Sequence, residues 1–327
     1  MSHRPNAAFV ALLAGTALSL FLSAAAAQSY PNKPIHVIVP YPAGGAVDAM
    51  ARVFAQKFNE ALGQPVIVEN RAGAGGNIGA EVVAKSPPDG YTWLINTSGQ
   101  AIAPGLYRRL NYDAVKDLTP VTQFVTTSLV LVVPPQLGVN SPKELIARAK
   151  AQPGKLNYGS TGIGSAPNLV GEMLRVGTVI NIIHVPYKGD AQLFPALFTN
   201  EVQLAFVPPQ TGLAHIKAGK IKALATTGLA RMSSLPDVPT MTESGVPEVQ
   251  YNGWVGLFMP GGTPRDIADK ISGEAAKILR MPDVAKYYPA WGVEPVGNTP
   301  DAFSAIYRSE IERFTKLIRE AKIPQVD

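Results

Sequence analysis

The sequence predicts an α/β protein built from two units, each a mostly parallel sheet flanked by helices. Three observations lead to this prediction. The chain has 327 residues, about the length of two domains. Short β-branched runs alternate with amphipathic helical patterns, as they do where helices cover a parallel sheet. The alternation begins again after residue 133, which indicates a second unit.

Residues 1–27 are expected to be removed rather than folded. Arg4 precedes an apolar run from Phe9 to Leu22, and the small residues of Ser23–Ala27 follow. This order is that of a secretory signal peptide with a cleavage site of the A-x-A type. A membrane span needs about 20 apolar residues, so cleavage near Ala27 is favoured over a retained anchor. We therefore expect an exported mature chain.

The first unit follows a β-α-β-α-β order. Residues 35–39 form the first predicted strand, and apolar positions from Val47 to Leu62 then recur at helical spacing until Gly63. A strand at 66–68, a helix at 77–85 and a strand at 91–95 follow. Because helices join consecutive strands, these strands should be parallel.

The second unit begins with a helix at Ser141, where Pro142 and Glu144 complete a capping box. Thr263 and Thr299, each followed by proline, are expected to start two later helices in the same way. Strands are expected at 181–185, 202–206 and 221–225. The last helix is expected to share one apolar face among Phe303, Ile306, Phe314, Leu317 and Ile318.

The helices after residue 250 are too many for the second unit, so the first unit is predicted to be discontinuous. The chain would leave it near 123–128 and return near 249–251. The predicted domains are residues 28–126 plus 249–327 for the first, and 127–248 for the second. No Gly/Ser-rich linker separates them, so the crossings should be extended hinges.

Composition excludes several classes of function. The chain has no cysteine, which excludes disulfides, thiol catalysis and thiolate metal sites. The four histidines lack metal-site spacing, so we expect no metal and no cofactor. The net charge is +5, and the Lys and Arg residues are scattered along the chain rather than clustered. Nucleic acid is therefore not an expected partner.

Two loops of the first unit are candidates for binding an anion. Residues 40–48 carry two glycines and end at a helix N-terminus, where free N–H groups and a partial positive charge favour an anion. Asp48 suits a helix cap as well as a ligand contact. Residues 96–99 follow the third strand, where ligands of open parallel sheets bind. A simple helix cap explains residues 96–99 equally well.

The glycine-rich segment 69–79 is expected to be a structural turn. It follows a strand and starts a helix, as a dinucleotide-binding loop does, but Ile78 occupies the third glycine position of G-x-G-x-x-G. The next strand also ends without the acidic residue that would bind a ribose. A dinucleotide cofactor is therefore not expected.

The second unit offers a matching pair of loops. Residues 158–168 form a glycine-rich loop that enters a helix, so each unit would present one such helix N-terminus to a shared ligand. In residues 184–190, Lys188 could pair with a carboxylate, although a solvated lysine is commoner. His184 is expected to lie in or beside its strand.

Catalytic motifs find little support. The chain has no G-x-S-x-G elbow, no P-loop and no evident carboxylate pair in the candidate loops. We therefore expect a binding protein and not an enzyme. A hydrolase or isomerase that pairs Ser98 with His184 is the main alternative, and a receptor that mainly contacts a sensor or permease is another.

Sequence marks across residues 30–322 resemble the extracytoplasmic solute receptors of tripartite tricarboxylate transporters, the Bug proteins. These marks are Tyr30-Pro-Asn-Lys-Pro-Ile35 and the segments 39–45, 62–79, 88–92, 187–189, 216–220 and 235–240. The resemblance implies a two-lobed, type II-like periplasmic binding protein fold with the ligand cleft between the lobes. It also implies a periplasmic location and a membrane permease as partner, and we expect a monomer.

The resemblance implies a small carboxylate ligand, such as a dicarboxylate, an acidic amino acid or an aromatic acid. The ligand-binding residues assigned on it are Tyr41, Ala43, Gly44, Gly45, Asp48, Thr97 and Ser98 in the first lobe, and Gly162, Gly164, Ser165, Asn168, Tyr187, Lys188 and Gly189 in the second. Family members often have His at the position of Asn168 and Gly at that of Asp190. A more apolar ligand is compatible with Val207 and Pro208 near the cleft.

Overall fold

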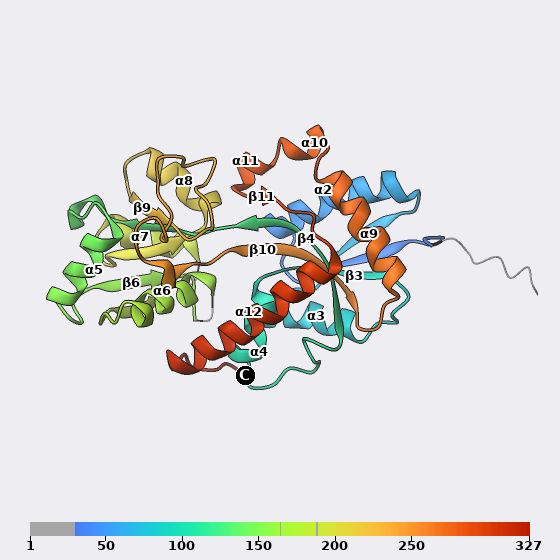
Figure 1. Ribbon diagram of the computed structural model, residues 1–327, viewed down its shortest axis with the longest axis horizontal. Coiled ribbons are helices and arrows are strands. Elements are labelled where there is room, and N and C mark those ends of the chain that lie inside the picture. The colour runs from blue at the N-terminus through green and yellow to red at the C-terminus, as the bar shows by residue number, and fades with distance from the viewer. Residues whose placement is uncertain (1–29, 164, 188) are drawn as a thin grey trace, which may run out of the picture.

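The structure is a computed structural model that describes residues 30–163, 165–187 and 189–327. The predicted signal peptide lies outside the described residues, and so do Gly164 and Lys188. Two sheets lie side by side along the longest dimension of the molecule (Figure 1). The architecture confirms the predicted two-lobed α/β fold.

The first sheet has six strands in the order β11-β4-β10-β3-β1-β2. Its strands are β1 (Ile35–Val39), β2 (Val66–Asn70), β3 (Thr92–Thr97), β4 (Leu118–Thr127), β10 (Gly253–Pro260) and β11 (Glu294–Pro295). Strand β1 is parallel to β2 and β3, and β10 is antiparallel to β3 and β4. Four strands thus share one direction, as a mostly parallel sheet requires.

Helices cover both faces of this sheet. They are α2 (Ala46–Leu62), α3 (Asn77–Ala84), α4 (Gly99–Leu106), α9 (Arg265–Ile278), α10 (Pro282–Ala285), α11 (Tyr288–Trp291) and α12 (Pro300–Glu320). Alternation along β1 sends Val37 and Val39 to the core under α2 and α9, and Ile38 to the core shared with α3, α4 and α12. Gly63 ends α2 with a left-handed φ of 67°, as predicted.

The second sheet has five strands in the order β7-β6-β8-β5-β9. Its elements are β5 (Val130–Val133), α5 (Pro142–Ala151), β6 (Asn157–Ser160), α6 (Ala166–Gly177), β7 (Ile183–Pro186), α7 (Asp190–Phe198), β8 (Leu204–Val207), α8 (Pro209–Lys217) and β9 (Lys222–Thr226). Strand β6 is parallel to β7 and β8, whereas β5 is antiparallel to β8 and β9. Strand β6 was not predicted, because Asn-Tyr-Gly-Ser contains no β-branched residue.

Three chain segments run together where one sheet gives way to the other. Thr227, just after β9, donates its N–H to the Leu129 carbonyl and accepts the Tyr251 N–H at its own carbonyl, both at 2.9 Å. Its hydroxyl accepts the Leu129 N–H at 2.9 Å and donates to the Tyr251 carbonyl at 2.7 Å. Thr227 thereby joins the two crossings. The domain boundaries at 126–127 and 248–249 stay a prediction.

Two of the three predicted helix N-caps are present in the structure. The Ser141 hydroxyl accepts the Glu144 N–H at 3.2 Å, and the Thr299 hydroxyl accepts the Ala302 N–H at 3.3 Å, as predicted. The expectation for Thr263 is wrong: α9 has Pro264 at its N-cap, and the Thr263 hydroxyl donates to the Pro260 carbonyl at 2.7 Å instead. That bond closes the turn between β10 and α9.

Helix α12 buries a face that differs in part from the predicted one. Phe303, Tyr307, Phe314 and Ile318 are buried, whereas Ile306 is 38% exposed and lies to one side. Glu310 also lies on the buried face and accepts the indole N–H of Trp254 at 2.6 Å. The helix contacts α4, β4 and α6, so it touches elements of both lobes.

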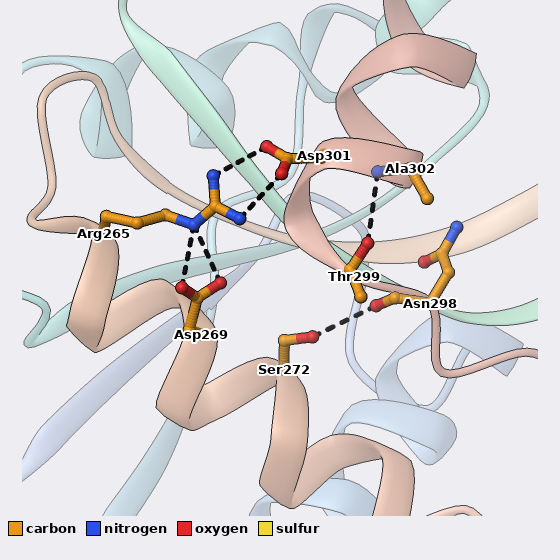
Figure 2. Close-up of polar contacts among 7 residues, drawn as sticks. All are labelled: Arg265, Asp269, Ser272, Asn298, Thr299, Asp301 and Ala302. Atoms are coloured by element: carbon orange, nitrogen blue, oxygen red, sulfur yellow. Dashed lines mark hydrogen bonds and ion pairs between the residues drawn. The ribbon is translucent and has the colours of Figure 1, made fainter.

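An exposed ion pair links the start of α12 to α9 (Figure 2). The Arg265 guanidinium donates to both Asp301 oxygens at 2.7 and 2.8 Å, and its Nε donates to Asp269 at 2.8 Å. Beside it, the Ser272 hydroxyl donates to the Asn298 carbonyl at 3.1 Å. Because these ions are well exposed, we expect them to orient the helix start and to add little stability.

Candidate functional site

A cavity of about 620 Å³ is lined by residues of both lobes. The first lobe and the crossings contribute Ala46, Val47, Met50, Gly75, Thr97, Ser98, Gly99, Ile102, Ala103, Leu106, Tyr107, Thr127, Leu129, Tyr251, Gly253, Trp254, Val255 and Val293. The second lobe contributes Ile163, Ser165, Ala166, Pro167, Asp190, Pro208, Gln210 and Thr211. The loops 40–48 and 158–168, singled out in the sequence, therefore lead into the same cavity.

Within the described chain, five helices begin at this cavity: α2, α4, α6, α7 and α8. Each helix start carries N–H groups without an intrahelical acceptor and a partial positive charge. The N-cap residues of α2, α4, α7 and α8 form no side-chain cap hydrogen bond, whereas Ser165 caps α6 through the Asn168 N–H. None of the described lining residues carries a positive charge. Among the described lining residues, positive potential therefore comes from backbone helix ends and not from side chains.

The first-lobe wall of the cavity includes the hydroxyls of Thr97 and Ser98, and each is positioned by a tyrosine. Tyr41 does not line the cavity, and its hydroxyl lies 2.8 Å from Asn96 Oδ1 and 2.7 Å from Thr97 Oγ1. Ser98 Oγ lies 2.7 Å from the Tyr251 hydroxyl. Burial raises the pKa of Tyr41 and of Tyr251, so both phenols stay protonated at neutral pH. Tyr41 and Tyr251 fix where Thr97 and Ser98 stand.

Asp48 holds the glycine loop and does not line the cavity. Its carboxylate accepts the Gly44 N–H at 2.8 Å, Arg52 Nε at 3.0 Å and Asn70 Nδ2 at 2.9 Å. Burial raises the pKa of Asp48, but these three hydrogen bonds outweigh burial and the pKa lies below its ordinary value. Ala43, Gly44 and Gly45 also lie outside the lining, whereas the next residue, Ala46, lies within it.

Of the residues assigned to the second lobe, Ser165 lines the cavity. The Gly162 carbonyl accepts the Ser165 hydroxyl at 2.7 Å, and Gly189 is the N-cap of α7 at a left-handed φ of 91°. Tyr187 turns its hydroxyl to Glu201 at 3.1 Å. Asn168 is buried, and its Nδ2 donates to the Tyr158 hydroxyl at 2.8 Å. Gly164 and Lys188 fall outside the described residues.

The catalytic pair considered in the sequence is not formed. Ser98 engages Tyr251, whereas His184 Nε2 lies 2.7 Å from Ser160 Oγ and its ring stacks on Tyr158 at 4.7 Å between centroids. His184 belongs to β7, as expected. Within residues 30–163, 165–187 and 189–327, no cluster of His, Asp and Glu side chains suits a metal ion.

Several lining residues escaped the sequence analysis as ligand contacts. Asp190, Gln210 and Thr211 form much of the second-lobe wall, and Gly75 and Tyr107 belong to the first. The signal for Gln210 and Thr211 was present: a strand ending at Val207 leads directly into a helix, as at the other loops. The segment 69–79 is a turn with left-handed glycines, as predicted, although Gly75 reaches the cavity.

The described part of the chain contains no helix that is long and apolar enough to cross a membrane.

Known proteins resemble this chain along most of its length. The family model described as "Tripartite tricarboxylate transporter family receptor" matches residues 50–323. Protein BugT of Bordetella pertussis is 39% identical over 298 residues, which cover 90% of this chain and 91% of BugT. Among solved structures, the periplasmic binding protein BugD is 33% identical with a TM-score of 0.73, covering 91% of this chain and 100% of that chain. Rpa4515 of R. palustris, solved with adipate, is 33% identical with a TM-score of 0.76 and the same coverage.

Proposed function

The chain belongs to the receptor family of tripartite tricarboxylate transporters, and from this premise we propose that it is a periplasmic solute-binding protein for a small organic carboxylate. It captures the acid between its lobes and delivers it to a tripartite permease. It acts as a monomer and catalyses no reaction. BugD is named a periplasmic binding protein and Rpa4515 was solved with adipate, which supports the location and the ligand class.

The observation that carries this proposal is the meeting of five helix N-termini at one cavity. A carboxylate placed there would accept N–H groups from the first turn of α2 and hydroxyls such as those of Thr97, Ser98 and Ser165. Tyr41, Gly44, Gly45 and Asp48 would shape the loop before α2. Charge-assisted hydrogen bonds contribute about 1.5–3 kcal/mol each, so a few of them suffice for a micromolar dissociation constant, about −8.2 kcal/mol.

Closure of the lobes would complete the site. Ligands of two-lobed proteins are buried as the domains rotate about their crossings, and water leaves the site. The mostly apolar lining, with Met50, Ile102 and Trp254, suits the carbon skeleton of the acid. A binding protein needs no nucleophile and base in contact, which agrees with the separate hydrogen bonds of Ser98 and His184.

The test replaces one N–H group at the cavity. Ala46 is the first residue of α2, and Gly45 before it is extended, so Ala46→Pro fits the backbone while it removes the N–H. Ala46→Val adds similar bulk and keeps the N–H. Calorimetry with a panel of mono- and dicarboxylates should show binding to the wild type, about tenfold weaker binding to Ala46→Pro, and a smaller loss for Ala46→Val. If no acid binds the wild type, the proposed function is wrong.

A further inference from the structure

Asp190 is an unexpected lining residue for a cavity where helix N-termini favour an anion, because its carboxyl group is acidic. It is the only carboxyl group among the described residues that line the cavity, and none of those residues is cationic. Its Oδ1 atom is buried and has no hydrogen-bond partner among the described residues. A buried polar atom without a partner costs free energy, so its presence calls for an explanation.

Capping of its own helix does not explain Asp190. It is the first residue of α7, one position after the N-cap Gly189, and a carboxylate in the first turn can accept free N–H groups of the helix start. Those N–H groups, from Gln192 and Leu193, donate instead to the Gly189 carbonyl at 3.3 Å each. Oδ1 therefore does not satisfy the helix end.

Among the described residues, no charged neighbour offsets the effect of burial on Asp190. Burial raises the pKa of Asp190, and the Thr211 hydroxyl offsets this only in part. No described ion pair includes Asp190. The cavity thus combines helix ends of both lobes, which favour an anion, with one carboxyl group of the second lobe, which favours a hydrogen-bond donor or a cation.

We propose that the ligand is a monocarboxylate whose far end carries an ammonium group, and that Asp190 is the residue that selects for it. This inference rests on the proposed function. The carboxylate would lie at the starts of α2 and α4, the ammonium group at Asp190, and an apolar spacer between them. Met50, Ile102 and Trp254, which also line the cavity, would contact that spacer. A dicarboxylate would place its second charge against Asp190 and be disfavoured.

A matched set of six-carbon acids tests this selectivity. Adipate carries a second carboxylate, 6-aminohexanoate an ammonium group, and hexanoate a methyl group at the same position. Calorimetry on the wild type should give a dissociation constant for 6-aminohexanoate at least about tenfold below that for adipate, with hexanoate between them. Asp190→Asn should remove this preference while hexanoate binding stays within about threefold.

Asp266→Asn is the control variant. Asp266 also lies in the first turn of a helix, α9, but is exposed and does not line the cavity, so the variant makes the same change of charge elsewhere. It should bind all three acids as the wild type does. Melting curves of both variants confirm that they are folded.

The outcomes separate the two proposals. If the wild type binds adipate more tightly than 6-aminohexanoate, or if Asp190→Asn leaves their ratio unchanged, Asp190 is not the selecting residue, and the solute-binding function still stands. If neither these acids nor the wider panel bind, the proposed function fails and the inference fails with it.

Discussion

Asp48 and Asp190 occupy the same kind of place and have opposite environments. Each lies in the first turn of a helix that begins at the cavity, Asp48 in α2 and Asp190 in α7. Asp48 accepts three hydrogen bonds and has a lowered pKa, whereas Asp190 has a raised pKa and one oxygen without a partner in the described part of the chain. Position at a helix start therefore does not decide the role of an aspartate, because the donors around it do.

The largest expected effect is on stability. Asp48→Ala should lower the free energy of unfolding by about 3 kcal/mol, because Gly44 N–H and Asn70 Nδ2 lose their acceptor and Arg52 its ion pair. Asp190→Asn should be neutral or stabilising, since it removes a carboxyl group that no described cation neutralises. Urea unfolding of both variants measures the difference. Equal losses of unfolding free energy in the two variants would contradict the different roles assigned to these residues.

The pH dependence of stability should differ in sign between the two sites. The folded-state pKa of Asp48 is lowered, so its contribution is present above the unfolded pKa and is lost as pH falls through the folded pKa. The folded-state pKa of Asp190 is raised, so this residue destabilises the protein above that pKa. The lost stability returns as pH falls from the folded-state pKa towards the unfolded-state pKa.

Melting temperatures between pH 7 and pH 3 measure this difference. Relative to Asp190→Asn, the wild type should become more stable on acidification; relative to Asp48→Asn, it should become less stable. Parallel curves for the wild type and both variants would contradict the two assignments.

The smallest expected effect concerns the hydroxyls of the first-lobe wall. Tyr41→Phe removes the bond that holds Thr97, and we expect carboxylate affinity to fall by about three- to tenfold, or about 0.5–1.5 kcal/mol. Tyr288→Phe is the control, because the Tyr288 hydroxyl donates to the Leu279 carbonyl at 2.7 Å and lies outside the cavity lining. Calorimetry with any bound acid gives both values. An equal loss in Tyr288→Phe would mean that Tyr41 acts only through stability.

The elements that the sequence predicted best are those whose own residues determine them. The strand Ile35–Val39 is β-branched, and α2 has both a regular apolar face and a terminal glycine. Strand β10 has no such local signal, because it contains two glycines and ends in proline. Its place depends on packing: a Cβ atom at Gly256 would lie 2.6 Å from the Phe303 ring. Contacts this distant in sequence leave no pattern in a single chain.

The same distinction applies to the candidate site. The glycine-rich loops at 40–48 and 158–168 were recognisable because glycine before a helix is a local signal. Gln210 and Thr211 follow two prolines and no glycine, so their only signal was the strand that leads directly into a helix. Whether Asp48 or Asp190 faces the cavity depends on partners such as Asn70, which lies 22 positions from Asp48.

Thr227 has a consequence for how the lobes can move. Its N–H, carbonyl and hydroxyl groups bind both Leu129 and Tyr251, so the three segments form one short ladder. Thr227 and Leu129 both lie in the predicted second lobe, so sliding of one lobe past the other would break the two bonds to Tyr251, whereas bending about an axis close to them would keep them. We therefore expect the lobes to open by rotation about one hinge axis. Each closure should then bring the same residues of the two lobes together.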